Sequence, residues 1–144
     1  MTDLVDLEIV TAHRVLVRTR ARDVYVPAAR GRAGILHHHL PYTALLGMGA
    51  VSYTDAAGKK HSLFLRGGLV ETLENRVVIL TERVLTAEEL DAEALEKELA
   101  AVRKTIKDAV KGETSPEELE KALEREKELA VKREIAGSGA GSKG

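Results

Sequence analysis

Two periods of apolar residues divide this 144-residue chain near residue 86. Up to residue 85, apolar and polar residues alternate in short runs; in residues 4–10, Val5, Leu7 and Ile9 share one face. Further runs include residues 14–20 and 23–26, and Pro27 indicates a turn after the latter. Eight or nine such runs at this spacing predict short β-strands that form a sandwich or barrel.

From Thr86 onward the period lengthens to about 3.6 residues, which is typical of an amphipathic helix. Thr86 and Glu89 have capping-box spacing and predict the helix start. Gly112 predicts its end, because glycine readily adopts the positive φ of a helix C-cap. The apolar stripe between them consists of Leu95, Leu99, Val102, Ile106, Ala109 and Val110.

Ser115 and Pro116 predict the start of a second helix, as N-cap and first helical residue. Its apolar side is less regular, because Glu126 and Arg133 interrupt it. That side consists of Leu119, Ala122, Leu123, Leu129 and Ala130. The short connection predicts an antiparallel hairpin, which needs the sandwich or a partner for stability.

These patterns together predict an α+β chain. An N-terminal all-β sandwich or barrel of about 8–10 short strands (residues 1–85) precedes an antiparallel two-helix hairpin (residues 86–136). The glycine-rich residues 137–144 are expected to be a flexible tail.

Composition narrows the range of functions. The chain has no cysteine, so it has neither disulfides nor thiolate chemistry. Its net charge of −1 combines +3 in residues 1–85 with −4 in residues 86–144, and aromatic residues make up only 3%. Neither half is basic or aromatic enough to suggest nucleic-acid binding. An acidic start and the lack of a long apolar run favour a soluble cytoplasmic protein.

A run of three histidines is the one feature that suggests a metal. His37 and His39 would share a strand face, with His61 elsewhere in the fold. No carboxylate follows within the next few residues, so we expect no metal site. The chain likewise has no phosphate-binding loop or nucleophile motif, and we expect neither catalytic residues nor a cofactor.

The order of elements resembles the epsilon subunit of F-type ATP synthases, which is equivalent to the mitochondrial delta subunit. Val26-Pro27, then Gly31-x-x-Gly34-Ile35-Leu36-x-x-His39-x-Pro41, match the strand–turn–strand signature of that family. Arg66-Gly67-Gly68 followed by Leu69-Val70-Glu71 matches its glycine turn into the last strands. The likeness covers about residues 4–136.

The resemblance implies a non-catalytic subunit of the central stalk, which couples ion-driven rotation of the membrane ring to the catalytic head. Its partners would be the gamma subunit, the c-ring and, when the hairpin extends, the alpha/beta head. It would be peripheral, at the cytoplasmic face of the plasma membrane, and attached only through the complex. The ring-facing tip would include Arg32, His38, His39 and Pro41, with Arg32 standing where relatives often have an acid.

The resemblance also implies that the hairpin regulates ATP hydrolysis. Cations of the second helix that would face the head are Arg125, Lys127, Lys132 and Arg133. Some relatives bind ATP through Ile/Leu-Asp-x-x-Arg-Ala, of which this chain keeps Leu90 and Asp91 but has Ala94 in place of the arginine. Without that cation, we expect weak or no ATP binding.

Two other interpretations remain open. A stand-alone sandwich with a helical arm could bind an unrelated partner, and co-purification with gamma and c-ring subunits would separate the two cases. A histidine metalloenzyme would contain bound metal in untagged protein.

Overall fold

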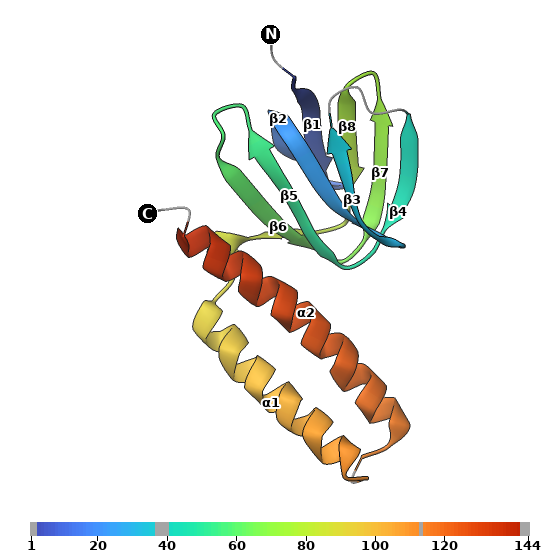
Figure 1. The fold of residues 1–144 in the computed structure, drawn as a ribbon, viewed down its shortest axis with the longest axis vertical. Helices are drawn as coiled ribbons and strands as arrows, with labels where there is room; N and C mark the ends of the chain where they lie inside the picture. Colours follow the sequence, from blue (N-terminus) through green and yellow to red (C-terminus); the bar gives the residue numbers. More distant parts are fainter. Residues whose placement is uncertain (1–2, 37–40, 113, 142–144) are drawn as a thin grey trace.

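The computed structural model describes residues 3–36, 41–112 and 114–141, with side chains up to residue 137. Nine strands form the N-terminal β-sandwich, and two long helices project from one end of it (Figure 1). The predicted α+β class and the strand number are confirmed. The strands are β1 (Val5–Val10), β2 (Val15–Ala28), β3 (Gly31–Leu36), β4 (Tyr42–Leu46), β5 (Gly49–Asp55), β6 (Lys60–Leu65), β7 (Gly68–Leu73), β8 (Arg76–Leu80) and β9 (Val84–Thr86).

The long strand β2 connects the two layers of the sandwich. Its first half pairs antiparallel with β1, and its second half pairs with β3 and β5. β1 continues the first layer through β8, β7 and β4, while β5 continues the second through β6 to β9. The sheet therefore wraps around one core instead of remaining flat.

The sequence predicted two separate strands within β2 and a turn at Pro27, and both predictions were wrong. β2 runs through 14 residues, and Pro27 pairs with Arg32 within the strand. Pairing with several neighbouring strands keeps β2 extended at the positions where the sequence pattern predicted a break or a turn. The proline carbonyl takes part, since it accepts a 2.7 Å hydrogen bond from the Gly47 N–H.

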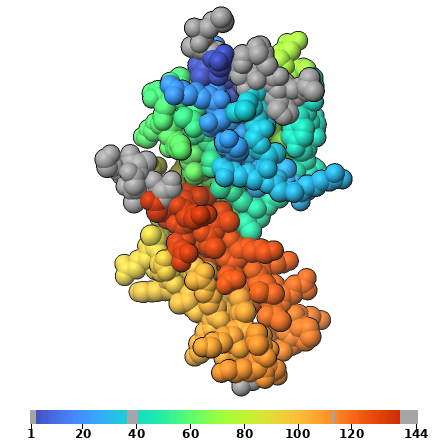
Figure 2. Space-filling model, viewed as in Figure 1, coloured from blue at the N-terminus to red at the C-terminus, as the bar shows by residue number. Residues whose placement is uncertain are grey.

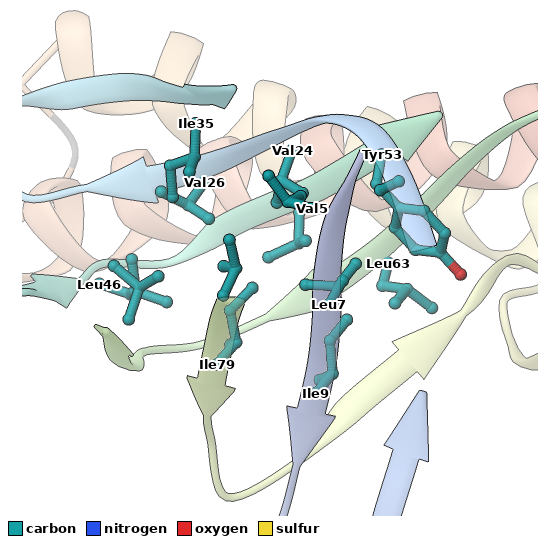
Figure 3. Close-up of a cluster of buried hydrophobic side chains, with 14 of the residues drawn as sticks. Val5, Leu7, Ile9, Val24, Val26, Ile35, Leu46, Tyr53, Leu63 and Ile79 are labelled. Atoms are coloured by element: carbon teal, nitrogen blue, oxygen red, sulfur yellow. The ribbon is translucent and has the colours of Figure 1, made fainter. Parts of the chain in front are cut away.

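Alternating side chains of the strands form the core. The predicted inward face of β1 is confirmed, because Val5, Leu7 and Ile9 are at most 1% exposed. In Figure 3 these residues lie in one cluster with Val24, with Ile79 of the neighbouring strand β8 and with other apolar side chains. With few aromatic residues, aliphatic packing supplies most of the hydrophobic stabilisation.

Helices α1 (Ala92–Val110) and α2 (Pro116–Gly141) form the predicted antiparallel hairpin (Figure 1). Its small core contains Leu95 and Leu99 of α1 together with Leu129 and Ala136 of α2. Gly112, with φ +82°, ends the first helix as expected. The second helix continues to Gly141, five residues beyond the predicted hairpin, so the start of the expected tail is helical.

The first helix begins later than the capping pattern predicted. Thr86 still belongs to β9, where it pairs with Leu63, and its hydroxyl donates to the Glu89 carboxylate at 3.2 Å without capping a backbone N–H. Residues Ala87–Glu89 form only a 3₁₀ turn, η1. The true N-cap is Asp91, whereas the predicted cap Ser115 does accept from the Glu118 N–H at 3.2 Å. Pairing with β6 therefore carries the sandwich one residue past the predicted boundary.

Candidate functional site

The structure separates the residues expected at the ring-facing tip. Arg32 lies at the start of β3, near the Leu46 end of β4, because Ala28 pairs with both Gly31 and Leu46. Pro41 directly precedes the other end of β4. The length of β4 separates Pro41 from the Leu46 end by about 17 Å, so Arg32 and Pro41 cannot form one small patch. His38 and His39, which belong to the same prediction, lie outside the described residues.

Arg32 lies on the side of the sandwich that faces the hairpin. Its guanidinium lies 4.5 Å from the centre of the Tyr25 ring, a cation–π distance. It also lines a cleft of about 570 Å³, together with Val131 and Glu134 of α2. A substitution at Arg32 can therefore affect hairpin packing as well as any external contact.

An apolar row crosses the outer face of four neighbouring strands. Strand register places Leu45 opposite Leu69, Leu69 opposite Leu80, and Leu80 opposite Val10. Leu45 is 71% exposed and Leu80 is 45% exposed. The row lines a groove of about 730 Å³, and exposed apolar groups aligned in this way are typical of a protein-binding surface.

Sequence reasoning missed this apolar row. The only signal was that outward positions of these strands, such as Leu45 and Leu80, carry leucine where a solvated face usually carries polar residues. Nothing in the alternation shows that the four positions share one register, because they come from four separated strands.

The hairpin packs against the sandwich through its second helix. Residues of α2 contact β5, β6 and η1, while α1 lies on the far side of α2 (Figures 1 and 2). The lower part of the hairpin extends away from the sandwich in Figure 2. In the described part of the chain, residues of α2 from Glu128 onward lie against the sandwich, whereas the other end of the hairpin lies away from it.

A buried carboxylate lies at the centre of that contact. Glu128 Oε1 accepts from Arg66 Nη1 at 2.5 Å, and Oε2 accepts from Arg66 Nη2 at 2.8 Å, an end-on bidentate pair. Oε2 also accepts from Arg125 Nη1 at 2.7 Å and Lys132 Nζ at 2.8 Å. We call these four residues the Glu128 cluster.

The Glu128 cluster is shielded from water at its middle. The side chains of Glu128 and Lys132 are 9% and 11% exposed. The Lys132 ammonium also lies 4.9 Å from the centre of the Phe64 ring. Burial alone raises the pKa of Glu128, but its hydrogen bonds to Lys132 and Arg66 outweigh this effect and hold the pKa below its usual value. The carboxylate is therefore charged at neutral pH.

Three of the four cations expected to reach the catalytic head are engaged inside the hairpin. Arg125 bonds Glu98 at 2.6 Å as well as Glu128, Lys132 bonds Glu128, and Arg133 bonds Glu96 at 3.4 Å. Lys127 is exposed. In this arrangement, Arg125, Lys132 and Arg133 stabilise the hairpin itself.

The degenerate nucleotide motif has a structural explanation. Asp91 accepts from the N–H groups of Glu93 at 3.1 Å and Ala94 at 3.2 Å, so its carboxylate caps α1. Leu90 packs against the hairpin core. Ala94 supplies no cation. Each residue that remains of the motif is thus accounted for by folding.

His61 pairs with Asp55 at 2.8 Å and stacks on Tyr53, with ring centres 4.7 Å apart. The hydrogen bond from His61, followed by those from the Lys59 and Ala57 N–H groups, lowers the pKa of Asp55. These bonds close the β5–β6 turn. Within the described part of the chain, no three His, Cys, Asp or Glu side chains gather where they could hold a metal.

Comparison with known proteins identifies the family. The model of a protein family described as "ATP synthase, Delta/Epsilon chain, beta-sandwich domain" matches residues 4–87. The chain belongs to the ATP synthase delta/epsilon family. It is 36% identical over 110 residues to the ATP synthase epsilon chain of Solibacter usitatus, covering 76% of this chain and 79% of that one. It is 37% identical over 91 residues to that of Nitratidesulfovibrio vulgaris, covering 63% and 67%.

The fold also occurs in solved ATP synthases. A chain in the Euglena gracilis mitochondrial ATP synthase, solved as OSCP/F1/c-ring, superposes with a TM-score of 0.69 and 17% identity, over 100% of this chain and 84% of that one. Epsilon chains are non-catalytic subunits of their complex. Among the described helices, none has a stretch long and apolar enough to cross a membrane.

Proposed function

We propose that this chain is the epsilon subunit of the central stalk, transmitting rotation of the ion-driven ring to the catalytic head. The observation that carries the proposal is a β-sandwich of the delta/epsilon family that carries an exposed apolar row on its outer face. The hairpin that follows it packs on the sandwich through a small interface. Such a chain has one permanent binding face and one movable element. It would be a peripheral component at the cytoplasmic face of the membrane.

The apolar row is the proposed contact with the gamma subunit. Leu45, Leu69, Leu80 and Val10 offer a groove of about 730 Å³, and burying exposed leucines favours association. Leu45→Glu places a charge in the middle of this contact and is expected to abolish co-purification with gamma. Leu73→Glu is a matched control, because Leu73 is 54% exposed on the same strand as Leu69 but lies outside the groove. Equal retention of gamma by both variants would contradict the assignment.

The proposed contact with the c-ring is an extended one, with Arg32 at one place and Pro41, which His38 and His39 precede in the sequence, at another. Reversing the charge with Arg32→Glu is expected to lower ATP-driven ion pumping while ATP hydrolysis continues. Because Arg32 also lines the cleft beside α2, the assay needs Glu134→Gln as a control for altered hairpin packing. Unchanged ion pumping in the Arg32→Glu variant would show that Arg32 does not contribute to the c-ring contact.

The hairpin is the proposed regulator of ATP hydrolysis. In the docked arrangement Arg125, Lys132 and Arg133 pair with acids of the hairpin itself, so these pairs would have to break before the cations could bind an acidic surface of the head. Truncation after Ala87, which retains all of β9, is expected to raise the ATPase activity of the assembled head without loss of assembly. Unchanged activity would leave the hairpin a purely structural element.

A further inference from the structure

The Glu128 cluster joins the two parts of the chain. Arg66 follows β6 directly, whereas Glu128, Arg125 and Lys132 belong to α2. Among the described residues, the Arg66–Glu128 bond is the ion pair that links the sandwich to the hairpin. Both carboxylate oxygens are used, so the pair fixes the orientation of the helix as well as its distance from the sandwich.

The balance of charge in this cluster is uneven. Three cations converge on a single carboxylate, and among the described acids only Glu98 also lies within bonding distance of one of them, Arg125. Without Glu128, Arg66 and Lys132 would face each other beside the Phe64 ring with no counter-charge. Like charges at a half-buried contact repel, and the helix would then be pushed away from the sandwich.

The nearby residues leave no comparable place for a ligand anion. Asp91 is engaged as the cap of α1, and Ala94 offers no positive charge. Of the described cations at the sandwich–hairpin contact, Arg66, Arg125 and Lys132 already surround Glu128, while Arg32 lies over the Tyr25 ring in the neighbouring cleft. The carboxylate thus provides the negative charge that would otherwise have to come from a bound molecule.

We infer that Glu128 is the built-in anion that holds the hairpin docked, so that docking in this chain does not depend on a bound nucleotide. This inference rests on the proposed regulatory role of the hairpin and specifies what controls its position. The docked state is then stabilised by a residue of the chain itself, and loss of the Glu128 charge weakens docking. The same cations would become available to bind an external anion once Glu128 is neutral.

The isolated full-length chain provides the test. It has no cysteine, so Ala57→Cys on the sandwich and Lys104→Cys on α1 allow two spin labels and a distance measurement. Glu128→Gln keeps the shape of the side chain but removes its charge, and is expected to lower the ratio of docked to released hairpin at least tenfold. Glu124→Gln, on an exposed position of α2, is the matched control and should leave the ratio unchanged.

Adding Mg-ATP or pyrophosphate distinguishes a role of Glu128 as an anion from a role in packing alone. Millimolar Mg-ATP should leave the distances of the unsubstituted chain unchanged, and millimolar pyrophosphate should restore docking of the Glu128→Gln chain. Arg66→Gln, at a side chain 65% exposed and outside the core, should release the hairpin in the same direction without unfolding the sandwich.

Three results would overturn the inference. The Glu128→Gln chain could show the same docked-to-released ratio as the Glu124→Gln chain, or Mg-ATP could change the spin-label distances of the unsubstituted chain. The third is that pyrophosphate does not raise the docked fraction of the Glu128→Gln chain. Because no head or ring is present, these outcomes do not decide the proposed inhibition of ATP hydrolysis. That role depends on the ATPase activity of the truncated complex. The two hypotheses can therefore fail separately.

Discussion

Shortening one buried leucine should unfold the hairpin while leaving the sandwich intact. Leu129 lies on α2 with 0% exposure and packs against Leu95 and Leu99. Leu123 lies on the same helix but is 42% exposed. Leu129→Ala and Leu123→Ala therefore make the same chemical change, with the same effect on helix propensity, at a buried and a half-exposed position.

The cost at each position follows from burial. Removing the outer carbons of a fully buried leucine loses about 2.4 kcal/mol of transfer free energy, and the cavity left behind brings the total to about 3–4 kcal/mol. At Leu123 the exposed side chain can be replaced by water, and we expect about 1 kcal/mol. The difference of about 2 kcal/mol corresponds to roughly a 30-fold change in an opening equilibrium.

Hydrogen exchange of the backbone amides measures this directly. Amides of α1 and α2 should lose about 30-fold more protection in Leu129→Ala than in Leu123→Ala, while amides of β1 and β8 keep theirs. Equal loss in both variants would refute the idea that the small hairpin core sets its stability. Loss across β1 and β8 as well would show that hairpin and sandwich unfold as one unit.

Three further perturbations test other parts of the fold. In Gly68→Ala the new Cβ would lie against the Leu80 carbonyl oxygen, at a backbone φ of +150°, so urea unfolding should show a loss of about 2–4 kcal/mol. Ser115→Ala should reduce protection of the first turn of α2 by about 1 kcal/mol, whereas Thr86→Ala, which removes no cap, should leave α1 unchanged. Because the pKa of Glu128 is lowered in the folded chain, its stabilisation is complete above the unfolded value and is lost as pH falls through the folded value. The docked fraction measured with spin labels should therefore stay constant down to about pH 4.5 and fall below it.

The sequence predicted best where a signal is local. The alternation of Val5, Leu7 and Ile9 defined one buried face, and Ser115 defined a helix start, because both depend on neighbours within a few residues. The prediction at Thr86 was wrong because strand pairing with Leu63 outweighed an equally good local capping pattern. A capping box contributes about 1 kcal/mol, which pairing and burial can easily exceed.

By itself, the sequence determined the α+β class, the division near residue 86, the antiparallel hairpin and the resemblance to a stalk subunit. The tertiary structure alone decided that Arg32 and Pro41 lie at opposite ends of β4, that Leu45 and Leu80 join one apolar row, and that Arg66 meets Glu128 across 62 positions of the chain. The physical reason is the range of the forces. Periodicity and capping act between neighbours, whereas register and charge pairing join segments whose relative position no local pattern records.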